Sequence, residues 1–181
     1  VADPNLHDGR YANNSWLQEA PDPMSKLSWD NAAFIGPSTA RALNIEPPSM
    51  LGKPFAERVT IEVDGRSADM IAWIVPGIAD NTVVLPMGYG RNFDGYLPYH
   101  DRGVVGFDVN PLRSVDSPDL LTGATMTKRG GKYPVACVQR FGQLEPGFEY
   151  AARSMVRETS VEGYRKDPKF AVEGIITHGE N

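Results

Sequence analysis

Alternating apolar and polar side chains stand out most clearly between residues 58 and 64. Val59, Ile61 and Val63 are separated by polar residues, which is the period of a strand with one buried face. The Asp64-Gly65 pair that follows is a strong signal for a two-residue hairpin turn. The sequence therefore predicts a strand over residues 58–64 that leads directly into a hairpin.

The return strand of this hairpin is predicted over residues 67–75. It becomes continuously apolar from Met70 to Val75, which is typical of a strand covered on both faces. Pro76-Gly77 ends it, because this pair punctuates regular structure. Shorter apolar runs predict further strands over residues 82–85, 104–109 and 133–139.

Helices are predicted to be few and short. Residues 37–43 begin with proline and continue with good helix formers, residues 149–158 carry a weaker helical pattern, and residues 160–166 favour a last turn before Pro168. The chain contains 18 Gly and 15 Pro, a density that excludes a helical bundle and suits short strands joined by tight turns. The pattern predicts a mostly β domain, in the form of a small barrel with a short helix inserted early.

Composition narrows the possible partners. The 181 residues weigh 19.8 kDa, enough for one domain, with or without a tail. With 18 Lys and Arg against 23 Asp and Glu the net charge is −5, which disfavours a nucleic acid or an anionic membrane surface. The longest mostly apolar stretch, residues 70–79, is too short to span a bilayer. The first fourteen residues carry no pattern of a signal peptide.

The residues that usually carry catalysis or hold metals are sparse. His7, His100 and His178 lie in separate segments and lack the spacing of a helical metal pair. Cys137 is the only cysteine, which excludes an internal disulfide and a Cys-ligated zinc or iron–sulfur site. Its apolar neighbours predict a buried, inert thiol. We therefore expect no catalytic residues and no metal site in this chain.

Two clusters are candidates for a binding site. Residues 13–31 contain Asn, Trp and Pro in an unusual concentration. Such a stretch forms either a shaped loop, whose Trp rings cover a barrel end while its Asn side chains bond loop backbone, or a polar pocket wall for an amide-like or pterin-like ring system.

The second cluster joins residues 88–91 to residues 109–113. Gly88 and Gly90 would let the backbone approach another group closely, and Arg91 and Arg113 could clamp a phosphate or carboxylate, although ordinary surface arginines are the default. If these loops are structural, Asn110 is expected to carry a buried hydrogen bond.

The stretch NNSWLQEAPDPMSKLSWDNAAFIGPSTARALNI, residues 13–45, resembles the B subunit of bacterial alternative complex III, a quinol-oxidising membrane assembly. WIVPGIADNTVVLPMGYGR and FDVNPLRS are similar to further segments of that family, and the resemblance covers about residues 8–115. It weakens over residues 120–150, where Arg140-Phe141-Gly142-Gln143 stands in place of an expected His-containing loop, and returns over residues 157–164.

The resemblance implies a double-psi β-barrel, as in the C-terminal domain of the dimethyl sulfoxide reductase superfamily, where the barrel contacts a molybdopterin dinucleotide. It also implies a loop-rich segment over residues 1–35, a barrel core over residues 36–150 and a tail over residues 151–181. The residues that would face such a cofactor are Trp16, Gln18, Gly88, Gly90, Arg91 and Asn110.

Two functions are consistent with this resemblance. In the first, the chain is a structural, non-catalytic barrel excised from a larger subunit on the periplasmic side of the inner membrane. It holds no cofactor, its partners are other domains and subunits of the complex, Trp16 and Trp29 face a partner, and iron–sulfur clusters belong to other domains. In the second, it is a true molybdopterin-guanine-dinucleotide domain of a catalytic oxidoreductase. A third hypothesis, from the residues alone, is a free-standing carbohydrate-binding or small-ligand-binding barrel.

Overall fold

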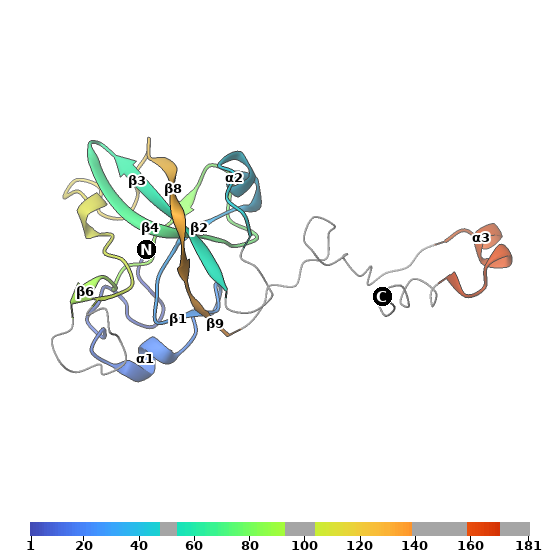
Figure 1. Ribbon diagram of the computed structural model, residues 1–181, viewed down its shortest axis with the longest axis horizontal. Helices are drawn as coiled ribbons and strands as arrows, with labels where there is room; N and C mark the ends of the chain where they lie inside the picture. The colour runs from blue at the N-terminus through green and yellow to red at the C-terminus, as the bar shows by residue number, and fades with distance from the viewer. Residues whose placement is uncertain (48–53, 93–103, 139–158, 171–181) are drawn as a thin grey trace. The chain divides into compact units, whose positions relative to one another are not determined.

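The computed structural model describes residues 1–47, 54–92, 104–138 and 159–170 (Figure 1). The chain divides into two compact units, Val1–Arg140 and Phe141–Asn181. All of the described strands belong to the first unit, and the described part of the second holds the helix α3 (Val161–Lys166).

A five-stranded sheet forms the centre of the first unit, in the order β5-β2-β4-β3-β8. The strand β2 runs parallel to β4, and the other neighbouring pairs are antiparallel (Figure 1). The strands are β2 (Ala33–Ile35), β3 (Phe55–Val63), β4 (Arg66–Ile74), β5 (Val83–Val84) and β8 (Thr125–Pro134).

The predicted hairpin between β3 and β4 is confirmed. Val63 pairs with Arg66 across the turn, and Asp64 and Gly65 have φ angles of 49° and 72°. Positive φ at both central residues is the geometry of a type I′ turn, whose twist matches that of the flanking strands.

The burial of these two strands follows the predicted pattern. Val59, Ile61 and Val63 are buried in β3, whereas Glu62 is exposed. The run of β4 from Met70 to Trp73 is buried without alternation, as expected for a strand covered on both faces.

The main core cluster lies on β2, β3 and β4 together with residues that pack against these strands. It includes Ala40 of α2 (Pro37–Ala42) and Leu112 of the 3-10 helix η1 (Asn110–Leu112). The helix α2 confirms the prediction over residues 37–43, and its first position is the proline that favours a helix start. The other buried members are Ala33, Ile35, Ile45, Val59, Ile61, Val63, Ala68, Met70, Ala72, Met87 and Val109.

Two short pairs of strands complete the first unit. The strand β1 (Leu27–Ser28) pairs with β9 (Ala136–Cys137), and β6 (Arg91–Asn92) pairs with β7 (Val104–Val105). The helix α1 (Ser15–Glu19) lies close to β1 (Figure 1).

Several predicted elements have different bounds. The strand predicted over residues 104–109 is limited to β7, and Gly106, the next residue, has a φ of 67°, which is not a strand conformation. The strand predicted over residues 133–139 is divided between the end of β8 and β9, and Val135 between them donates its N–H to Pro54 O. The strand predicted over residues 82–85 is limited to β5.

The predicted turn over residues 160–166 is confirmed as α3. Ser160 caps it by accepting a hydrogen bond from Gly163 N–H at 3.1 Å. The helix predicted over residues 149–158 lies outside the described residues.

The predicted mostly-β fold class is confirmed, since strand exceeds helix and the helices are few and short. Within the described residues no sheet closes on itself to form a barrel. None of the described helices combines the length and apolar character that crossing a membrane requires.

Candidate functional site

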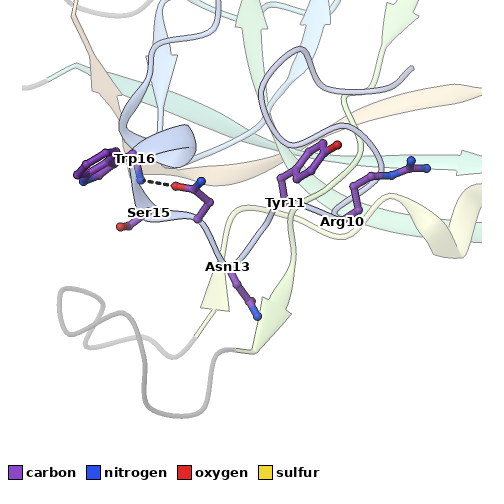
Figure 2. Close-up of a pocket in the computed structure, with 6 residues that line it drawn as sticks. Arg10, Tyr11, Asn13, Ser15 and Trp16 are labelled. Carbon is purple, nitrogen blue, oxygen red and sulfur yellow. Dashed lines mark hydrogen bonds between the residues drawn. The ribbon is translucent and has the colours of Figure 1, made fainter.

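The N-terminal loop and the start of α1 form an open groove of about 490 Å³ (Figure 2). Its lining side chains come from one stretch of chain: Arg10, Tyr11, Asn13, Asn14, Ser15 and Trp16. Four of the six, Asn13 to Trp16, belong to the first of the two clusters that the sequence singled out, whereas Arg10 and Tyr11 precede it and were not predicted.

The start of α1 determines how Trp16 is presented. Asn14 is the N-cap residue, and its Oδ1 accepts hydrogen bonds from Trp16 N–H at 3.1 Å and from Leu17 N–H at 3.4 Å. Capping fixes Trp16 in the first turn, where its side chain is 81% exposed. Figure 2 shows Trp16 at one end of the row of lining residues and Arg10 at the other, with Tyr11 beside Arg10.

The polar lining side chains carry donors that no described residue accepts. Asn13 and Asn14 are exposed, and Ser15 is half-buried. Within the described part of the chain, the Tyr11 and Ser15 hydroxyls and the Asn13 and Asn14 side-chain N–H groups donate no hydrogen bond.

Arg10, the charged residue in the groove, is already paired. Its Nε and Nη2 donate to the two oxygens of Asp8, each at 2.9 Å. This bidentate pair holds the pKa of Asp8 below its usual range, because hydrogen bonds to the carboxylate favour its ionised form. The pair is neutral as a whole, so the groove carries little net charge.

Gln18 fixes the loop beneath this groove and does not line it. The side chain is 1% exposed, and its Nε2 donates to Ala12 O. Its backbone carbonyl accepts a hydrogen bond from Trp29 N–H at 2.9 Å, which ties α1 to the segment after β1. The structure places Gln18 among the residues that hold this region together.

Gly88 and Gly90 allow the close approach that the sequence predicted, and the group approached belongs to the chain itself. A Cβ on Gly88, which has a φ of 101°, would lie 3.1 Å from Leu6 Cβ and 3.2 Å from Gly9 N. A Cβ on Gly90, with a φ of 86°, would overlap the backbone of Asp108. The intervening Tyr89 packs with Leu6 and Val105 in a second, smaller buried cluster.

The two arginines of the second cluster differ in their surroundings. Arg91 is exposed on β6. Arg113 donates from Nε to Pro118 O at 3.0 Å and from Nη1 to Asn110 Oδ1 at 3.3 Å, so much of its guanidinium is engaged in its own loop.

Asn110 does not carry the buried hydrogen bond that was expected. It is exposed, and its backbone and side-chain N–H groups both donate to Asp108 Oδ1, at 2.9 and 2.8 Å. The expectation failed because Asn110 lies in an exposed Asx turn, in which the Asp108 carboxylate accepts the backbone N–H two residues further on.

Among the residues whose burial the structure describes, the buried asparagine is Asn31, which the sequence analysis did not separate from its cluster. It is 2% exposed, and its Nδ2 donates to Pro86 O at 2.8 Å and to Phe107 O at 3.0 Å. Its Oδ1 accepts from Phe107 N–H at 2.7 Å. One side chain thus joins three segments that are distant in sequence, which no local pattern could indicate.

The remaining candidates are dispersed. His7 is exposed, with Nδ1 3.6 Å from Asp8 Oδ1, and His100 and His178 lie outside the described residues. Cys137 is half-buried, not buried as predicted, because the strand β9 lies at the margin of the unit. Among the residues that the structure covers, no group of three or more His, Cys, Asp or Glu could hold a metal ion.

The three tryptophans occupy different environments. Trp16 is exposed, Trp29 is half-buried with a φ of 66°, and Trp73 is buried with its Nε1 donating to Ser25 O at 3.2 Å. Of the six residues predicted to face a cofactor, only Trp16 lines the groove.

Comparison with known proteins adds no assignment: no protein-family model matches the chain, and the search of curated proteins found no match.

Proposed function

We propose that this chain is a non-catalytic, double-psi-barrel-like domain of a quinol-oxidising electron-transfer complex, located on the periplasmic side of a bacterial inner membrane. Its role is to pack against other domains and subunits of that complex, which carry the redox centres. The proposal joins the resemblance of residues 8–115 to the B subunit of alternative complex III with the geometry of the candidate residues.

The observation that carries the proposal is the use of these residues by the chain itself. Gln18 bonds Ala12, Gly88 packs on Leu6 and Gly9, and Gly90 packs on Asp108. A cofactor-binding loop keeps its backbone N–H groups and its glycine surfaces open to the ligand. Here the same features stabilise the loops, as expected of a scaffold.

The exposed surface agrees with packing against a partner. A Trp side chain that is 81% exposed leaves a large apolar area in water, and Trp is enriched where proteins meet. Tyr11 and Arg10, two further residue types that are enriched at interfaces, line the same groove.

The test is the molybdenum and pterin content of the protein that carries this chain, purified from detergent-solubilised membranes. We expect neither molybdenum nor pterin, together with iron, haem and quinol oxidation in the same fraction. Molybdenum and pterin at one equivalent per chain would overturn the proposal and favour a molybdopterin-dinucleotide domain instead.

A further inference from the structure

We propose that the groove between Tyr11 and Trp16 binds an extended, proline-containing segment of a partner protein. This inference rests on the proposed function and deepens it, since it names the kind of chain that the scaffold holds. It follows from three properties of the groove: two exposed aromatic rings, a set of hydrogen-bond donors and no net charge.

The rings supply the apolar part of the site. Tyr11 is 51% exposed and Trp16 is 81% exposed, and Figure 2 shows them apart from each other, with Asn13 and Ser15 between them. Exposed Tyr and Trp rings are the surfaces on which proline rings pack in known grooves for proline-rich segments. They offer a large contact area with few rotatable bonds, so little side-chain entropy is lost on binding.

The hydrogen-bond donors of the groove favour a partner segment whose backbone carbonyl groups are free to accept. The hydroxyls of Tyr11 and Ser15 and the side-chain N–H groups of Asn13 and Asn14 line the groove and donate to no other described residue. A helix has already used most of its carbonyls, whereas a polyproline II segment has no internal hydrogen bonds and presents all of them. A donor-rich groove therefore fits an extended segment better than a helix.

The lack of net charge in the groove favours a partner segment without charged side chains. Arg10 is the charged side chain of the lining, and the carboxylate of Asp8 neutralises it through two hydrogen bonds of 2.9 Å. An acidic peptide would compete with Asp8 for the guanidinium, and a basic one would meet the same paired charge. Neither an acidic nor a basic peptide gains affinity from this pair, so an uncharged segment is favoured.

The groove can be tested on the full chain by NMR titration with decaproline. We expect shifts of the Trp16 indole N–H and of the Asn13 and Asn14 side-chain amides. The indoles of Trp29 and Trp73 are not expected to move, because neither residue lines the groove. A Gly-Ser decapeptide, which is flexible and lacks the rings, should bind more weakly.

Substitution of Trp16 then tests whether the peptide binds on the aromatic ring. Trp16→Ala should raise the Kd for decaproline at least about tenfold, followed through the Asn13 amide. Met24→Ala is the matched control, since Met24 is 63% exposed and does not line the groove. No shift with decaproline, or shifts with maltohexaose alone, would overturn the inference, and the latter result would identify a carbohydrate groove.

A photo-crosslinker in the assembled complex separates this inference from the proposed function. With p-benzoylphenylalanine in place of Trp16, we expect cross-links to an extended, proline-containing stretch of another domain or subunit, and far fewer from the same group at Met24. An intact complex whose cross-links from position 16 reach only helices, or no protein, would overturn the inference and leave the scaffold proposal standing. If molybdenum and pterin overturn the scaffold proposal instead, the decaproline titration still decides the groove.

Discussion

At the scale of single residues, the strongest constraint comes from the buried amide of Asn31. Its three hydrogen bonds reach the carbonyls of Pro86 and Phe107 and the N–H of Phe107. Asn31→Ala would remove the side chain that bonds these backbone groups, at a position that is 2% exposed. We expect a loss of about 3 kcal/mol in the free energy of unfolding, measured by urea denaturation.

Asn110→Ala is the matched control for this substitution. Asn110 is exposed, and its partners Asp108 and Arg113 can bond water when the amide is removed. A change within about 0.5 kcal/mol is expected. Equal losses at the two positions would contradict the assignment of Asn31 as the residue that joins the segments.

The carboxyl group of Asp3 gives a prediction for pH dependence. Burial raises its pKa above the usual value, against the lowering effect of the hydrogen bonds that its Oδ1 accepts from Asn5 and Leu6 N–H. A raised pKa means that the folded state binds the proton more tightly than the unfolded state does. The stability that this group contributes is therefore present below pH 3.8, and it is lost as the pH rises through the pKa of folded Asp3.

Asp3→Asn isolates this effect, because the amide oxygen can accept the same two hydrogen bonds without a charge. From about pH 3.5 to about pH 7, we expect the wild type to lose stability relative to this variant, measured by urea denaturation at several pH values. The other carboxylates, including Asp8 with its lowered pKa, are common to both proteins and cancel in the difference. A difference that is constant with pH would show that the pKa of Asp3 is not raised.

At the scale of elements, the segment Gly88-Tyr89-Gly90 depends on the absence of a side chain at Gly90. Gly90→Ala adds a Cβ that overlaps the backbone of Asp108, and it also strains a φ of 86°. Gly123 has a similar φ of 74°, but a Cβ at that position would meet no neighbouring atom within 4 Å, so Gly123→Ala carries the conformational cost alone.

The difference between these two variants measures the close packing. We expect Gly90→Ala to be less stable than Gly123→Ala by about 1–3 kcal/mol, the usual cost of overpacking. Thermal unfolding at one pH gives the comparison. Equal effects would mean that the backbone near Asp108 moves aside without cost.

The sequence predicted those helices and strands whose signal, such as alternating apolar residues or a turn-forming pair, lies within a few consecutive residues. The β3–β4 hairpin has alternation in one strand, a buried run in the other and Asp64-Gly65 between them. The strand β8 has no such pattern: Gly130 and Gly131 both have positive φ, and nearly all of its residues are exposed, so its strand character depends on pairing with β3. The short strand β2 is specified by its neighbours β4 and β5 and was not predicted.

The candidate site shows the same limit. The sequence identified residues 13–16 of the groove, but not Arg10 and Tyr11, and it identified the close approach at Gly88 and Gly90. It could not show that the groups approached would be Leu6, Gly9 and Asp108, because those contacts are tertiary.

At the scale of the whole molecule, the division into two units has a direct consequence. The buried hydrophobic residues that the structure describes all lie between Leu6 and Val135, and α3 contributes none. A unit that contains its own core is able to fold by itself. We therefore expect a chain that ends at Arg140 to keep the free energy of unfolding of the full chain within about 1 kcal/mol, measured by urea denaturation.

A chain that ends at Leu121 is the control, because it removes β8 and with it the pairing to β3 from Phe55 to Glu62. Met126 of β8, which packs against the main core, is lost as well. This shorter chain is expected to lose the cooperative transition, whereas the chain that ends at Arg140 keeps it. If both truncations abolished the transition, the stability of the sheet would depend on residues 141–181, and the first unit could not be treated as a domain.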